Sequence, residues 1–125
     1  MIDIKALSIE EFISQNNLIE VKYPIITPDE FGRIIREEEE DGNYKTYEFE
    51  NDTTELNITK EVHGNKSGVI KTITRTFVGE DMMDYYEDST GIKIKNEWTD
   101  GVKTKTVRIV GDIIYIDGKL YEAQS

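Results

Sequence analysis

Turn signals recur about every ten residues from Tyr44 to the end of this chain. They are short groups of Gly, Asn, Asp and Ser at 51–52, 63–68, 79–81, 89–91, 100–101, 111–112 and 117–118. The stretches between them have strand length and are rich in β-branched and aromatic residues. Because turns this short join antiparallel neighbours, the rhythm predicts an antiparallel β-meander. We expect one domain over residues 1–125. Its fold class is α+β, mostly β, with the meander forming a curved sheet or an open barrel.

Two helix-start signals precede the meander. Ser8 followed by Glu11 is a capping box, and it predicts a short helix from about residue 9 that frays near Asn16. The sequence Thr27-Pro28-Asp29-Glu30 repeats that pattern, with proline at the first helical position. Between the two signals, apolar and charged residues alternate over 18–23, which predicts a strand.

Residues 33–40 allow two interpretations. As a helix, they form i,i+4 pairs between arginine and glutamate. As a strand, they pair across an Asp41-Gly42 turn, with Glu38 opposite Lys45 and Ile34 opposite Phe49. We favour a short helical turn followed by the hairpin, so the expected fold has one or two short N-terminal helices.

In the later hairpins, the turn residues and the apolar pattern together predict which residues pair across the strands. A two-residue turn at Asp100-Gly101 places Ile94 opposite Val107, and the other face then carries lysines 93 and 95 together with Arg108. The arm 113–116 is apolar on both faces, which is typical of a strand at the centre of a sheet.

Charge sets the strongest limit on function. The chain has 26 acidic and 15 basic residues, a net charge of −11, and only 37% hydrophobic residues. Twelve carboxylates fall within residues 29–61 and five within 80–88. Such a surface repels nucleic acid and anionic membranes and attracts basic surfaces. We therefore expect a basic protein as partner, with no direct nucleic-acid or membrane binding.

The N-terminal residues and the composition bear on compartment and chemistry. No long apolar run follows Met1–Lys5, so we expect neither a signal peptide nor a membrane span, and a cytoplasmic or virion-associated protein. There is no cysteine, and His63 is the only histidine, in a polar loop that predicts an exposed hairpin turn. No nucleophile elbow, phosphate loop or metal-ligand spacing occurs. We expect no catalytic residues, no metal, no cofactor and no enzymatic activity.

The best candidate contact residues are acidic positions interleaved with Tyr and Met, which are enriched at interface cores. They are Asp81, Met82, Asp84, Tyr85, Tyr86, Glu87 and Asp88, together with the run Glu37, Glu38, Glu39 and Glu40. The plainer alternative places two of the large side chains in the core and leaves the acids solvated. Residues 91–108 are mildly basic by contrast, and this dipolar charge makes self-association possible.

Three functions fit these observations. The first is a non-enzymatic inhibitor or immunity-type protein of phage or mobile-element kind. Its carboxylates would stand in for phosphates on the basic surface of a partner, for example a nucleic-acid-binding surface. The second is a structural or assembly subunit of a virion or surface layer. The third is a small-ligand binder or enzyme with a cone-shaped α+β fold.

Overall fold

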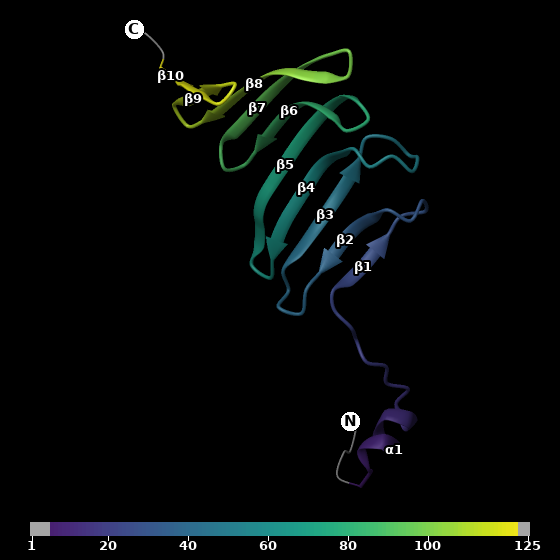
Figure 1. Cartoon of the computed structure of the whole chain (residues 1–125). Helices are drawn as coiled ribbons and strands as arrows, with labels where there is room; N and C mark the ends of the chain where they lie inside the picture. Colours follow the sequence, from purple (N-terminus) through teal and green to yellow (C-terminus); the bar gives the residue numbers. More distant parts are fainter. Residues whose placement is uncertain (1–5, 123–125) are drawn as a thin grey trace.

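The structure is a computed structural model that describes residues 6–122, so the Met1–Lys5 stretch discussed above lies outside it. The described residues form one helix, α1 (Ile9–Gln15), and ten strands. The strands are β1 (Ile25–Pro28), β2 (Ile34–Glu38), β3 (Tyr44–Phe49), β4 (Ile58–Asn65), β5 (Gly68–Gly79), β6 (Met82–Asp88), β7 (Ile92–Thr99), β8 (Val102–Val110), β9 (Ile113–Ile116) and β10 (Lys119–Tyr121). Each strand pairs antiparallel with the next, in the order β1 to β10 (Figure 1). The predicted meander is confirmed, as an open sheet and not a closed barrel.

The sheet is a single layer, and no described element covers either face (Figure 1). Among the described residues, Ile73 is the only buried hydrophobic side chain, at 4% exposure. Four polar residues are also buried, namely Arg33, Asn57, Asp88 and Asn96. The fold therefore depends on ladder hydrogen bonds and cross-strand side-chain pairs, with few side chains removed from water on both sides.

Helix α1 starts where the capping box predicts. The Glu11 amide donates to Ser8 Oγ at 3.1 Å, and the Ser8 hydroxyl lies 3.0 Å from the Glu11 carboxylate. The helix ends at Gln15, and residues 16–24 lead away from it to β1. α1 contacts no strand of the described chain. No helix within residues 6–122 is long and apolar enough to cross a membrane.

Two predictions about the first thirty residues are wrong. Thr27-Pro28 ends strand β1 and does not start a helix, because Asp29 closes a tight turn by accepting from the amides of Phe31 and Arg33 at 2.9 and 3.0 Å. Residues 18–23 form no strand, although their apolar and charged residues alternate. Alternation stabilises a strand only when a neighbour supplies hydrogen-bond partners, and none lies beside this segment.

The strand interpretation of residues 34–38 is correct, but its register is wrong by one residue. Lys45 pairs with Glu37 and not with Glu38. The turn is longer than two residues because the Glu39 amide donates to the Asn43 carbonyl at 2.8 Å. Gly42 takes a φ of 90°, which residues with a side chain rarely adopt. Glycine is therefore favoured at this position of the longer turn.

The β7–β8 hairpin has the predicted turn and an unpredicted bulge. Asp100 and Gly101 take φ values of 52° and 77°, as a two-residue hairpin turn requires. A bulge beyond Trp98 then shifts the register, so that Ile94 pairs with Arg108. Arg108 therefore lies on the opposite face from lysines 93 and 95, which corrects the predicted grouping. Strand β9 lies next to the sheet edge and not at its centre.

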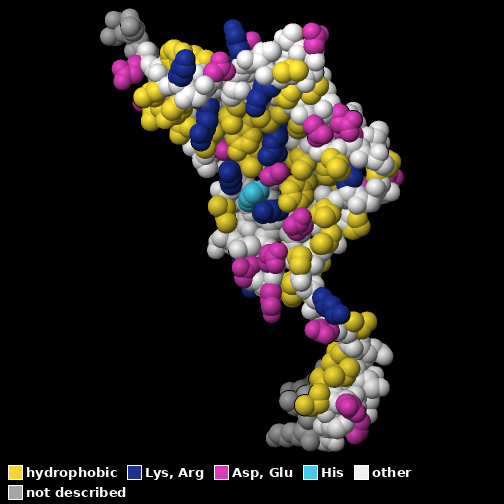
Figure 2. Space-filling view, in the orientation of Figure 1, with side chains coloured by type: hydrophobic (Ala, Val, Ile, Leu, Met, Phe, Trp, Pro, Cys, Tyr) yellow, Lys and Arg dark blue, Asp and Glu magenta, His cyan; other side chains and the backbone are white. Residues whose placement is uncertain are grey.

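The register sorts the side chains into two faces, because cross-strand partners point the same way. The front face carries the row Tyr47, Glu61, Ile73 and Asp88 across β3 to β6. The back face carries the row Lys60, Thr74, Glu87 and Lys93 across β4 to β7. His63 lies on the front face within β4, half-buried, and not in an exposed turn as predicted. Figure 2 shows this face, with the histidine among Lys and Arg side chains and hydrophobic patches around them.

Candidate functional site

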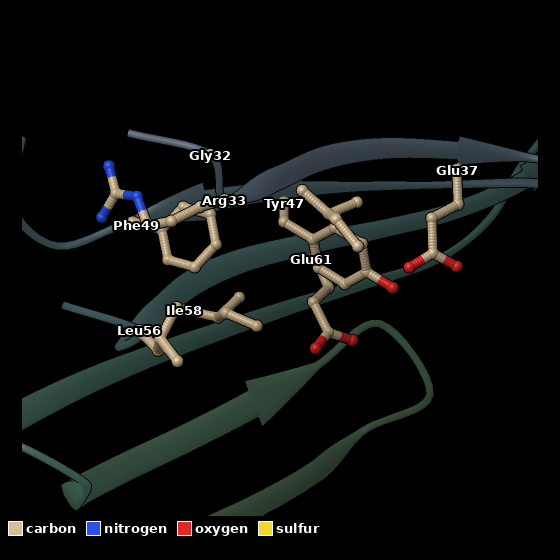
Figure 3. A pocket seen from close by; sticks show the side chains of 9 residues that line it. Gly32, Arg33, Glu37, Tyr47, Phe49, Leu56, Ile58 and Glu61 are labelled. Carbon is tan, nitrogen blue, oxygen red and sulfur yellow. The ribbon is translucent and has the colours of Figure 1, made fainter. Parts of the chain in front are cut away.

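An open hollow with an apolar floor lies on the front face of the sheet. Its floor is apolar and comes from β2, β3 and the start of β4, and its volume is about 550 Å³. It is lined by Gly32, Arg33, Ile34, Glu37, Tyr47, Phe49, Leu56, Ile58 and Glu61 (Figure 3). A second depression of about 270 Å³ shares three of these residues and adds Arg75, Phe77, Asp81 and Met83. We call the two together the hollow.

Leu56 is the most exposed hydrophobic residue of the hollow. It is 63% exposed, two residues before the start of β4, and lies beside Ile58 (Figure 3). Isolated exposed apolar residues are ordinary, but Leu56 adjoins the Phe49 ring and the half-buried Phe77 in one continuous apolar surface. The floor thus offers apolar area that the described chain leaves in contact with water.

Arg33 builds one wall of the hollow. Its side chain is buried, donates to an Asp29 carboxylate oxygen at 2.9 Å, and donates to the carbonyls of Asn51 and Glu55 at 2.9 and 2.8 Å. Its guanidinium also lies 4.2 Å from the centre of the Phe49 ring, a cation–π contact. One arginine therefore ties the β1–β2 turn to the β3–β4 loop.

The contacts with Arg33 and Phe31 change the pKa of Asp29. Desolvation by burial raises the pKa of Asp29, but hydrogen bonds from the Arg33 and Phe31 amides and from the Arg33 guanidinium outweigh it. The net pKa lies below the ordinary value, so the carboxylate stays charged beside Arg33.

Asn57 closes the end of the hollow. It is 3% exposed, donates from its amide group to the Gly79 carbonyl at 3.0 Å, and accepts from the Asp81 amide at 2.9 Å. These bonds link the β3–β4 loop to the β5–β6 turn, where Asp81 takes a φ of 58°. The same end of the sheet therefore holds three connected loops around the apolar floor.

A polar network lines the side of the hollow toward β6. Glu61 accepts from Arg75 at 3.3 Å and lies 3.0 Å from His63 Nε2. The Arg75 guanidinium lies 5.5 Å from the Tyr86 ring centre, and the Tyr86 hydroxyl donates to Asp88 at 2.7 Å. Each of these charged groups has a partner, so the network fixes the positions of the side chains.

The hydrogen bond between Tyr86 and Asp88 shifts the pKa values of these two residues in opposite directions. Burial and the hydrogen bond to Asp88 raise the pKa of Tyr86 to about 12. Burial alone would raise the pKa of Asp88, but hydrogen bonds from Thr90, Tyr86 and the Ile92 amide lower it to about 2. Tyr47, on the hollow floor, also has a raised pKa, because burial and the nearby Glu37 and Glu61 disfavour its anion.

The structure distributes the predicted contact residues over both faces. Asp81 lines the hollow, whereas Asp84 accepts from Thr76 at 2.6 Å outside it. Tyr85 and Glu87 lie on the back face, where Glu87 is 3.8 Å from Lys93. Met82 lies beside Asp84, near Trp98 of the β7–β8 hairpin. Tyr86 and Asp88 belong to the front-face network, so residues 81–88 do not form one patch.

The acidic run is divided in the same way. Glu37 lines the hollow, and Glu38 pairs with Arg36 at 3.6 Å on the back face. Glu39 and Glu40 are exposed in the β2–β3 turn, at the end of the sheet away from Asn57. Only Glu37 and Asp81 of the eleven predicted residues line the hollow.

Most residues of the hollow have no signal in the sequence. Arg33, Asn57 and Arg75 matter because the register brings them beside partners 14 to 24 positions away. One signal was available, since the hairpin interpretation placed Ile34 near Phe49, and both side chains line the hollow.

The hollow can bind apolar groups but has few groups suited to chemistry. Its lining residues include no serine, threonine, cysteine or lysine. Within residues 6–122, no cluster of three or more His, Asp or Glu side chains could hold a metal ion. No protein-family model, curated protein or solved structure matches the chain, so the site has to be interpreted from its own geometry.

Proposed function

We propose that this protein is a non-enzymatic protein-binding domain, and that its hollow holds a basic segment of a partner protein through an apolar side chain. The observation that carries the proposal is an exposed apolar floor at the end of the sheet where every connecting loop is acidic. In the inhibitor version of this function, the partner is a protein with a basic, nucleic-acid-binding surface.

The loops around the hollow supply the charge. Consecutive hairpins alternate between the two ends of a sheet, so the β1–β2, β3–β4 and β5–β6 connections share one end. They carry seven carboxylates, namely Asp29, Glu30, Glu50, Asp52, Glu55, Glu80 and Asp81. Arg33 is the only basic residue in these connections, and it is buried and paired. Asp29 and Glu55 are ion-paired with Arg33, and the other five have no ion-pair partner in the described residues. Unpaired surface carboxylates steer a basic partner and speed its association.

The apolar floor supplies the anchor. Interfaces draw most of their affinity from a few large side chains in well-packed pockets, surrounded by a polar rim. A Leu, Phe or Met of the partner would cover Leu56 and Phe49, while a neighbouring Lys or Arg would reach Glu37 or the acidic loops. The arrangement combines an apolar contact with charge complementarity in one place.

Selection of peptides from a random phage-displayed library tests this proposal without a known partner. We expect enriched peptides to place Lys or Arg beside a large apolar residue. Leu56→Asp should abolish their binding, and Glu80→Lys with Asp81→Lys should weaken it at least about tenfold. Leu120→Asp is the matched control, because Leu120 is 62% exposed on β10, far from the hollow.

The same pair of variants controls a capture experiment from native lysate at two salt concentrations. A partner of the hollow is released at high salt, where exposed charges are screened. It is also lost with Leu56→Asp and retained with Leu120→Asp. Peptides without positive charge, or binding that survives Leu56→Asp, would overturn the proposal.

A further inference from the structure

The back face of the C-terminal strands carries a second apolar surface, and its charge is opposite to that of the chain. The register places the side chains of β6 to β9 on it in rows. We call it the lysine strip, made of Tyr85, Glu87, Lys93, Lys95, Glu97, Lys105, Val107, Ile109, Ile114 and Ile116. Tyr85, Lys93, Lys95, Val107 and Ile109 also line a shallow depression of about 250 Å³.

The strip has three lysines and two glutamates on an apolar background. Lys93 lies 3.8 Å from Glu87, so that pair is neutral together. Lys95 and Lys105 have no carboxylate at ion-pairing distance in the part of the chain that the structure describes. Lys105 lies opposite Glu97 in the register, so the strip has a net charge of +1, against −11 for the whole chain, and an apolar centre.

The N-terminal arm, residues 6–24, has the complementary character. Ile9, Phe12 and Ile13 lie at helical spacing on one side of α1, and Ile9 and Ile13 are 79% and 45% exposed. The extended part adds Leu18, Ile19 and Val21, each at least 46% exposed. The arm carries Glu10, Glu11 and Glu20 against Lys22, and α1 contacts no strand. It is an acidic, apolar segment without a partner in the described chain.

Geometry favours the arm of another molecule. Strands in a sheet are about 4.8 Å apart, so β8 lies about 34 Å from β1, where the arm is attached. The nine residues 16–24 span about 30 Å when fully extended, at about 3.3 Å each. A molecule could bring α1 over Val107 and Ile109 on β8 of its own strip only with this segment fully stretched around the sheet. A second copy faces no such limit.

We propose that two copies of this chain exchange arms, each placing α1 and residues 18–21 on the lysine strip of the other. Ile9, Phe12 and Ile13 would cover Val107, Ile109 and Ile116, while Glu10 and Glu11 would pair with Lys95 and Lys105. Because the exchange is reciprocal, it closes as a symmetric dimer. It uses a different face from the hollow and does not depend on the function proposed there.

Sedimentation velocity over a range of concentrations gives the first test. We expect a reversible dimer that dissociates as salt rises, and a chain lacking residues 1–24 that stays monomeric. Glu10→Lys with Glu11→Lys, or Lys95→Glu with Lys105→Glu, should each raise the dissociation constant at least about tenfold. A mixture of these two double variants should form a heterodimer, because both of its arm–strip contacts regain opposite charges.

Cysteine cross-linking identifies the contact, since the chain has no cysteine of its own. Ile13→Cys chains mixed with Ile109→Cys chains of a different mass should form a disulfide-linked heterodimer under mild oxidation. Val69→Cys is the control, because Val69 is 62% exposed on β5, away from the strip. A doubly substituted Ile13→Cys/Ile109→Cys chain should give linked dimers and not a looped monomer.

Several outcomes would overturn the proposal. They are a monomer at every concentration, a dimer that persists without residues 1–24, equal cross-linking at Val69, or a looped monomer from the doubly substituted chain. Failure of the mixed charge variants to pair would also overturn it. None of these outcomes bears on the hollow, which Leu56→Asp tests separately.

Discussion

The hollow and the lysine strip are both apolar surfaces on one sheet, but they hold their charges differently. Arg33, Glu61, Arg75 and Asp88 around the hollow are each bound by hydrogen bonds or ion pairs. On the strip, Lys95 and Lys105 have no such partner within residues 6–122. Charged groups that are paired within the chain stabilise the folded structure around them. Unpaired charged groups remain available to pair with a partner protein. This contrast predicts different costs when the two sets are mutated.

Removing Arg33 should give the largest effect. Arg33→Ala leaves the β3–β4 loop without the donors that hold it to the β1–β2 turn, and we expect a loss of about 3 kcal/mol in the free energy of unfolding. Urea unfolding followed by circular dichroism measures it. Arg36→Ala is the control, since Arg36 is 41% exposed in its ion pair with Glu38 and should cost under about 1 kcal/mol. Equal losses from both variants would contradict the contrast.

Asp88→Asn should come next, at about 2 kcal/mol near neutral pH, because Asp88 is buried and accepts several hydrogen bonds. Its folded-state pKa of about 2 lies below the ordinary 3.8. The charged form therefore stabilises the fold above about pH 4, and this contribution is lost as pH falls toward 2. The difference in stability between wild type and Asp88→Asn should shrink over that range. A difference independent of pH would contradict the assignment.

Tyr86→Phe should cost about 1 kcal/mol, since it removes one hydrogen bond to Asp88 and leaves the ring in place. The pKa of Tyr86 is raised from 10.0 to about 12, so its contribution is complete below pH 10 and is lost as pH rises toward 12. Alkaline titration of tyrosinate absorbance should lose one late-titrating tyrosine in the variant, while Tyr47, whose pKa is also raised, still titrates late in both proteins. Tyr85→Phe, on the back face, is the matched control.

The smallest effect should come from the strip. Lys95→Gln and Lys105→Gln should each change the free energy of unfolding of the monomeric chain by less than about 0.5 kcal/mol, because neither lysine has an ion-pair partner in the described chain. The chain lacking residues 1–24 is the sample for this measurement, so that self-association does not enter. A loss of unfolding free energy close to that of Arg33→Ala would mean that the strip lysines are bound within the chain as firmly as Arg33 is.

Turn chemistry made the strand order predictable. Each predicted turn between strands occurs, because Gly, Asn and Asp adopt the backbone angles that short hairpins need, and a meander requires only local pairing. The capping box of α1 was likewise readable, since its bonds join residues three apart. Registers were less predictable, because one bulge near Trp98 moved Arg108 to the other face.

The sites depended on distant pairing, and the sequence could not show them. Arg33, Asn57 and Arg75 resemble any polar residue until the sheet places their partners beside them. The contact residues predicted from composition were adjacent along a strand, where successive side chains point to opposite faces. Residues 81–88 were therefore bound to separate, although they form one acidic run in the sequence.

By itself, the sequence determined the strong negative charge, the capped helix and the succession of hairpins, because composition and local hydrogen bonding fix each of these. The tertiary structure decided that the sheet stays open as a single layer, and it decided which side chains share a face. It also decided that buried arginine and asparagine side chains hold the loops around an apolar floor. These features arise from contacts between residues far apart in the chain, and such contacts exist only once the register of each strand is set.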